Sequence, residues 1–96
     1  MTDRELLEAA AKAAGYHLSS VSEMIWSDTQ GEFVLWNPLT DDGDALRLAV
    51  KLDLTVMIGA VRDVSGQLFL DKSEDDLEAT RRAIVRAAAE IGRSKA

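Results

Sequence analysis

The sequence contains no cysteine, and this absence excludes several kinds of site at once. Without thiols there is no disulfide framework, no thiolate metal ligand and no cysteine nucleophile. The chain has a single histidine, His17, and no serine or acidic residue stands at a spacing that suggests a catalytic triad. Glycine-rich phosphate loops and the zinc-protease motif are also missing. We therefore expect no catalytic activity and no cofactor, and the lack of cysteine fits a reducing cytoplasm.

Long apolar runs are missing as well. The longest candidate, residues 54–61, has the length of a strand rather than of a membrane span. The N-terminus has no basic segment followed by an apolar one, so we expect neither a signal peptide nor a membrane anchor. The net charge of −6 disfavours non-specific binding to nucleic acid and to anionic lipid.

The composition is that of a globular protein. Hydrophobic residues make up 47% and charged residues 29% of the 96 positions. A chain of this length has enough apolar surface for one core and too little for two. We therefore expect one domain over residues 1–96.

Two helices are predicted at the ends of the chain. Thr2 and Glu5 have the spacing of a capping box, and Gly15 is placed to end the helix that they begin. Ser73 and Asp76 resemble a second capping box, which predicts a last helix over about residues 74–91 with Gly92 as its stop.

The best-specified helix lies in the middle. Thr40 or Asp41 can cap it, and Asp42 and Asp44 place negative charge in its first turn. Apolar residues then follow at helical spacing, namely Ala45, Leu48, Ala49 and Leu52.

Four segments have strand character: residues 16–26, 32–36, 54–61 and 67–70. Residues 54–61 (LTVMIGAV) are apolar on both alternating faces, which predicts a central strand that is covered on both sides. Three helices around a mainly antiparallel sheet of three to four strands give an α/β fold, and we expect a three-layer α/β/α sandwich.

The acidic cluster at Asp41, Asp42 and Asp44 is one candidate site. A calcium loop fails, because its ligand positions would fall on apolar residues such as Ala45 and Leu48. A magnesium site that uses two carboxylates stays open. The interpretation we favour is that the carboxylates cap the helix and complement its dipole, so we assign no metal.

The arginines of the last helix are the second candidate. Arg82, Arg86 and Arg93 share a face, with Arg81 beside them. Residues 71–80 have a net charge of −4 and residues 81–96 a net charge of +4. This stripe could bind a phosphate or an acidic group. Acids at the start and bases at the end also stabilise any helix, and we favour this second interpretation.

The two tryptophans flank the first pair of strands and are the third candidate. Trp36 directly precedes the middle helix, and we expect it to pack in the core. Trp26 precedes a polar turn and is the better candidate for an exposed contact, although a core position stays open.

Residues 36–52 (WNPLTDDGDALRLAVKL) resemble the phage ABA sandwich family of small phage and prophage proteins. Residues 79–90 (ATRRAIVRAAAE) are similar to the closing segment of that family. Together the two stretches cover about a third of the chain. The resemblance implies an α/β/α sandwich and a phage origin, but no reaction and no catalytic residues.

Three hypotheses about function follow. The first is a non-catalytic phage accessory protein in the cytoplasm of a bacterial host that binds a protein, either a host protein such as a defence factor or a second copy in a homodimer. The second is a small-ligand or nucleotide binder that uses Arg82, Arg86 and a tryptophan. The third is a metal-dependent enzyme built on the acidic cluster, which we consider the weakest.

Overall fold

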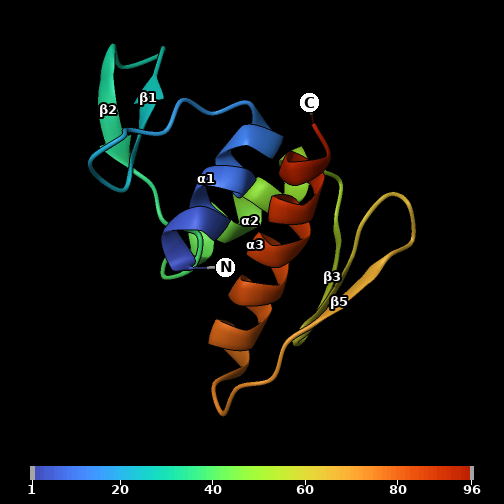
Figure 1. Ribbon diagram of the computed structural model, residues 1–96. Coiled ribbons are helices and arrows are strands. Elements are labelled where there is room, and N and C mark those ends of the chain that lie inside the picture. The colour runs from blue at the N-terminus through green and yellow to red at the C-terminus, as the bar shows by residue number, and fades with distance from the viewer. Residues whose placement is uncertain (1, 96) are drawn as a thin grey trace.

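The computed structural model describes residues 2–95 and contains three helices and five strands (Figure 1). This confirms the predicted α/β class with antiparallel strands. The elements in chain order are α1 (Asp3–Ala14), β1 (Met24–Ser27), β2 (Glu32–Leu35), α2 (Asp42–Lys51), β3 (Thr55–Met57), β4 (Ala60–Arg62), β5 (Leu68–Leu70) and α3 (Asp76–Ser94).

Helices α1 and α3 share the largest contact between elements. The capping box of Thr2 and Glu5 is confirmed, and Gly15 ends α1 in the left-handed conformation. Small residues allow the two helices to approach closely, since buried alanines line both, among them Ala10 and Ala14 of α1 and Ala83, Ala87 and Ala88 of α3.

Two predictions about α3 are wrong. Its N-cap is Asp75 rather than Ser73, with the Asp75 carboxylate accepting from the N–H of Leu77 at 2.9 Å. Gly92 does not stop the helix, which continues to Ser94. A Cβ at Gly92 would collide with the backbone carbonyl of Ala9, so this glycine serves the approach of α1 to α3.

The prediction that residues 54–61 form one central strand is wrong. These residues fold into the hairpin of β3 and β4, in which Met57 pairs with Ala60 across the two-residue turn Ile58–Gly59. Gly59 has φ +70°, which favours glycine, and its N–H donates to the Thr80 hydroxyl of α3 at 2.9 Å. Strand β5 then pairs with β4 to complete a three-stranded antiparallel sheet.

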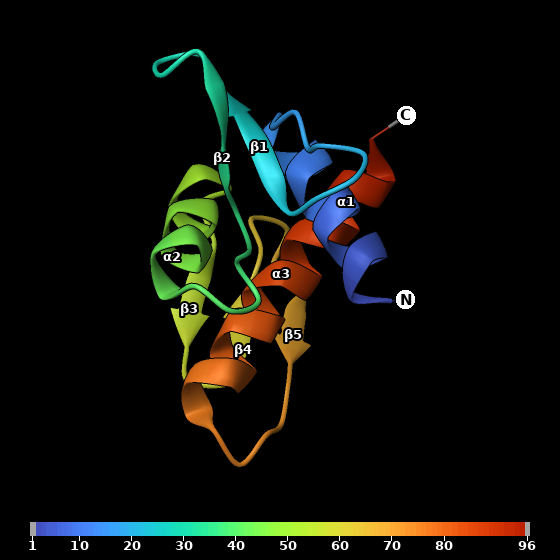
Figure 2. The same ribbon diagram turned by 90° about the vertical axis from the view of Figure 1, so that its left-hand side faces the viewer.

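The layers differ from the expected order of helix, sheet and helix. The three helices lie together on one side of the β3–β5 sheet (Figures 1 and 2). Val61 and Phe69 are buried on that side. On the other side no element of residues 2–95 covers Met57, Leu68 and Leu70, which are 45%, 42% and 57% exposed. The face of the β3–β5 sheet that points away from the helices is therefore apolar and exposed to solvent.

Strands β1 and β2 form a separate two-stranded sheet that projects from the helices (Figures 1 and 2). Strand character in residues 16–26 is limited to β1, while residues 17–19 run beside it through the Leu18–Ile25 bridge. Trp26 N–H donates to the His17 carbonyl at 3.0 Å on this side of β1. Within residues 2–95, no helix is both long and apolar enough to cross a membrane.

Candidate functional site

Trp36 anchors the β1–β2 hairpin to the helices. It directly follows β2 and is only 3% exposed, which confirms its predicted place in the core. Its ring meets the Tyr16 ring edge-to-face with 5.6 Å between centroids, and Tyr16 directly follows the end of α1. This aromatic contact sets where the hairpin leaves the body of the protein.

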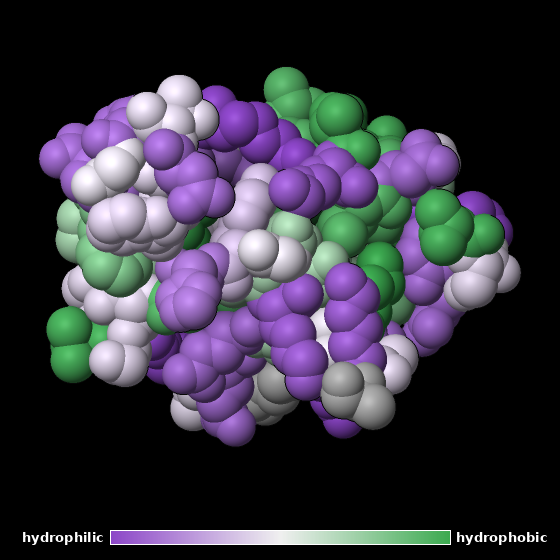
Figure 3. Space-filling model, turned by 90° about the horizontal axis from the view of Figure 1, so that it is seen from above, coloured by the Kyte–Doolittle hydropathy of each residue, from purple (hydrophilic) through white to green (hydrophobic). Residues whose placement is uncertain are grey.

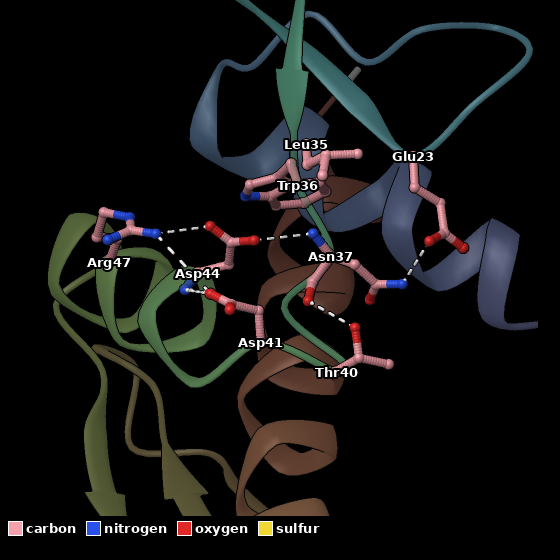
Figure 4. Close-up of a pocket in the computed structure, with 8 residues that line it drawn as sticks. All are labelled: Glu23, Leu35, Trp36, Asn37, Thr40, Asp41, Asp44 and Arg47. Atoms are coloured by element: carbon pink, nitrogen blue, oxygen red, sulfur yellow. Dashed lines mark hydrogen bonds and ion pairs between the residues drawn. The ribbon is translucent and has the colours of Figure 1, made fainter.

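The carboxylate of Asp44 joins the hairpin to α2 (Figure 4). Its Oδ2 accepts from the N–H of Asn37 at 3.0 Å, and its Oδ1 accepts from Arg47 at 2.7 Å. The N–H of Asp44 in turn donates to Asp41 Oδ2 at 2.8 Å, which confirms Asp41 as the cap of α2. On the other side, Asn37 Nδ2 donates to Glu23 at 2.7 Å. The acidic cluster thus fixes the geometry of a chain connection.

The remaining acid of the cluster, Asp42, pairs with Arg81 of α3 at 2.7 Å. Each of the three carboxylates therefore has a backbone or arginine partner. Within residues 2–95, no group of three or more His, Cys, Asp or Glu side chains is arranged to hold a metal ion.

Two adjoining hollows lie where the hairpin meets α2. The first, of about 460 Å³, is the one drawn in Figure 4, with Leu35 and Trp36 on one wall and Asp41 and Arg47 on the other. The second, of about 770 Å³, continues past Trp36 towards Lys51 and the turn after β1. Together they form a groove under the hairpin, which we call the hairpin groove.

Aromatic and basic groups meet in the hairpin groove. Lys51 Nζ lies 4.9 Å from the centre of the Tyr16 ring, a cation–π distance, and has no carboxylate partner within residues 2–95. Burial raises the pKa of the Tyr16 hydroxyl, an effect that Arg47 opposes and Asp44 reinforces. The hydrogen bond that Arg47 donates to the Asp44 carboxylate raises the pKa of Arg47. Among residues 2–95 that line the groove, no hydrogen bond pairs a nucleophile with a base.

The arginines of α3 are engaged in ion pairs. Arg82 pairs with Asp3 at 2.9 Å, Arg86 with Asp71 at 3.3 Å and Arg93 with Glu90 at 3.3 Å. Arg81 also donates to the carbonyl of Leu39 at 2.8 Å. These contacts tie α3 to the start of α1, to the end of β5 and to the segment before α2.

The predicted arginine face is also divided in space. Arg82 lines one small hollow with Asp3, and Arg86 and Arg93 line another with Phe69. Trp26 lines the hairpin groove instead, so the structure does not bring it together with these arginines. A binding role for the arginine face remains a prediction. The carboxylates that pair with these arginines give each side chain a structural contact.

One face of the hairpin carries Trp26, Phe33 and Leu35; we call it the outer face, and it borders the hairpin groove at Trp26 and Leu35. Trp26 and Phe33 are paired across the strands and meet edge-to-face, with 5.3 Å between ring centroids. They are 43% and 41% exposed, and Leu35 on the same face is 82% exposed. Trp26 Nε1 donates to Asp28 at 2.9 Å, which holds the indole in place. The hairpin therefore presents a rigid aromatic pair with an exposed leucine beside it.

Apolar side chains also reach the surface elsewhere. The view from above shows several apolar areas separated by polar ones (Figure 3). On α2, Leu46 and Val50 are 62% and 73% exposed, and Leu77 of α3 is 59% exposed. The hairpin differs from these positions because its aromatic rings are preordered by contact with each other.

The sequence reasoning missed Phe33, Leu35 and Lys51. A signal for the first two was present, since residues 33–36 (FVLW) are apolar on both strand faces and a strand with one wet face would alternate. Nothing in the sequence indicated Lys51, because its contact with Tyr16 joins positions 35 residues apart.

Comparison of the chain with protein-family models, with curated proteins and with solved structures finds no match in any of the three.

Proposed function

We propose that this protein is a small phage or prophage accessory protein that acts without catalysis, by binding another protein in the cytoplasm of its bacterial host. The observation that carries the proposal is the outer face of the β1–β2 hairpin. Trp26, Phe33 and Leu35 remain exposed there although Trp36, next in the chain, is buried.

The chemistry of this face suits a protein partner. Tryptophan and other large aromatic residues are enriched at the energetic centres of interfaces, where they enter apolar pockets. The Trp26–Phe33 contact lowers the entropy that would be lost on binding, because the rings already restrain each other. The net charge of −6 favours a partner with a basic rim around such a pocket, as in a host defence protein that binds nucleic acid.

Site-specific photo-crosslinking tests this proposal. A photoreactive phenylalanine analogue replaces Phe33 in cells that express the chain, and the same analogue at Leu77 is the control, since that side chain is exposed on α3. We expect a specific adduct with a different protein from position 33, lost when Trp26→Ala is added. Equal adducts from both positions, or adducts with no other protein, would contradict the proposal.

A small-ligand binder is the second candidate, and the hairpin groove favours it. Lys51 lies over the Tyr16 ring in a hollow of about 770 Å³, and no carboxylate of residues 2–95 pairs with it. A thermal-shift screen with nucleotides and phosphorylated metabolites tests it. Stabilisation of the wild type that Lys51→Ala removes would support a nucleotide or phosphate ligand, and no shift at millimolar ligand would refute it.

A further inference from the structure

Strand β2 has one paired and one free edge. On β1, Met24 and Trp26 point their backbone groups away from β2, since the Met24 carbonyl accepts from Ser19 and the Trp26 N–H donates to His17. The bonds between β1 and β2 therefore use the residues in between, such as Ile25 and its partner Val34. The bond from the Trp36 N–H to the Glu23 carbonyl, at 2.9 Å, follows the same alternation. It follows that Phe33 and Leu35 point their N–H and C=O groups towards the free edge.

The free stretch has a defined end. Asn37 is the next residue whose N–H points to this edge, and Asp44 accepts from it at 3.0 Å. No such partner bonds to the backbone N–H of Phe33 or Leu35 within residues 2–95. In Figure 2, β2 is the outer strand of the hairpin and no other strand lies on its free side. Two donors and two acceptors are thus open to another strand.

We infer that β2 pairs with β2 of a second copy of this chain, antiparallel and across a two-fold axis at Val34. This arrangement places Phe33 opposite Leu35 of the other copy and Leu35 opposite its Phe33. Each facing pair exchanges two backbone hydrogen bonds, so all four open groups of each copy are satisfied. The two hairpins become one four-stranded sheet, whereas a two-stranded sheet alone is only marginally stable.

The side chains fit the same arrangement. Glu32, which has no ion-pair partner within residues 2–95, comes opposite Trp36 of the other copy. Beside Trp36 lies the hollow of about 460 Å³ that Arg47 lines, and the Arg47 side chain is 69% exposed. The Arg47 guanidinium there already pairs with Asp44 at 2.7 Å, so a second carboxylate adds little and the backbone bonds carry the pairing. On the opposite face, the apolar outer surfaces of both hairpins join.

The dimer rests on the proposed function only in that both use the same hairpin. Pairing of the two copies would join their outer faces and double the apolar surface that a partner protein would meet. The dimer can fail separately. A chain that is monomeric, yet gives the position-33 adduct with another protein, would overturn the dimer and leave the proposed function standing. A dimer that gives no adduct with another protein would support the pairing of β2 strands and contradict the proposed function.

Sedimentation over a concentration series, up to millimolar protein, tests the dimer. Leu35→Pro removes the N–H that faces the free edge and fixes φ at this position, while the backbone groups of β2 that bond to β1 belong to other residues. Leu35→Ala is the matched control, because it removes the side chain and keeps the N–H. We expect a monomer–dimer equilibrium in which the proline variant dissociates roughly ten- to one-hundredfold more readily than the alanine variant. A wild type that stays monomeric, or equal effects of both variants, would overturn the inference.

Hydrogen exchange of the wild type provides a test that does not depend on any variant. The amides of Phe33 and Leu35 should exchange more slowly as the protein concentration rises, while the amide of Leu68 in β5 stays unchanged. Association without added protection at Phe33 and Leu35 would mean that the copies meet elsewhere, and would also overturn the inference.

Discussion

The α1–α3 interface and the β1–β2 hairpin use their apolar residues in opposite ways. In the interface, alanines and a glycine bring two backbones together, and side chains such as Leu7 and Val85 are at most 1% exposed. In the hairpin no strand residue is fully buried, and the aromatic pair is more than 40% exposed. Burial on this scale is the main source of stability. The buried contact between the helices therefore holds the fold, whereas the hairpin leaves its apolar face exposed to solvent.

Truncation of a large side chain in each region should show the greatest contrast. Leu7→Ala removes a side chain that is 1% exposed, and should lower the free energy of unfolding by about 2–5 kcal/mol. Leu35→Ala, at 82% exposure, should change it by less than about 0.5 kcal/mol. Urea unfolding of both variants at low protein concentration measures the difference. Similar losses of unfolding free energy would contradict the distinction between the buried interface and the exposed hairpin.

The close approach of α1 and α3 makes Gly92 the next most sensitive position. Gly92→Ala should destabilise by about 1–3 kcal/mol, because the new methyl group collides with the Ala9 carbonyl. The control is Gly43→Ala in α2, where a Cβ meets only side-chain atoms of Arg47 and Asp41. That variant should be neutral or slightly stabilising, as alanine favours helix. Thermal unfolding of the pair decides whether the backbone contact matters.

Asp44 links the hairpin to α2, and its loss should have an intermediate effect. Asp44→Ala leaves the Asn37 N–H and Arg47 without their acceptor, and should cost about 1–3 kcal/mol. Asp42→Ala removes an exposed pair with Arg81 and should cost less than about 1 kcal/mol. Chemical unfolding with and without magnesium measures both variants. If magnesium stabilises the wild type and either substitution abolishes that stabilisation, the magnesium interpretation is supported.

The smallest effect is expected at the N-terminal cap of α1. Hydrogen bonds from the Thr2 backbone and hydroxyl lower the pKa of Glu5. A carboxylate whose pKa is lower in the folded state adds stability above its unfolded pKa, and this stability is lost as the pH falls through the folded value. Glu5→Gln should therefore lower the melting temperature slightly at neutral pH, and the difference should shrink as the pH falls below the unfolded pKa of about 4.3 and vanish below the lower, folded pKa. A difference that persists in acid would contradict this.

Local chemistry explains which elements could be predicted from the sequence. The caps at Thr2, Asp41 and Gly15 involve residues within a few positions of each other, so their spacing alone indicates them. The β3–β4 turn was missed because residues 54–61 are apolar except for Thr55, and only Gly59 marked the reversal.

The candidate site was harder to predict because its contacts are long-range. The pairs of Arg81 with Asp42 and of Arg82 with Asp3 join residues 39 and 79 positions apart, and no spacing rule reaches that far. Gly92 was misread for a related reason, since the approach of α1 that requires a glycine there is set by tertiary packing. For Trp26 the sequence left core and surface open, and the structure places it in the exposed aromatic pair.

The free energy of unfolding of the double variant Trp26→Ala/Phe33→Ala, measured where the chain is monomeric, shows whether the aromatic pair stabilises the fold. If the hairpin keeps its outer face for binding, removal of both rings should cost about 1 kcal/mol, roughly the value of their mutual contact. A loss as large as that of Leu7→Ala would show that the rings hold the fold together, and would contradict the central claim.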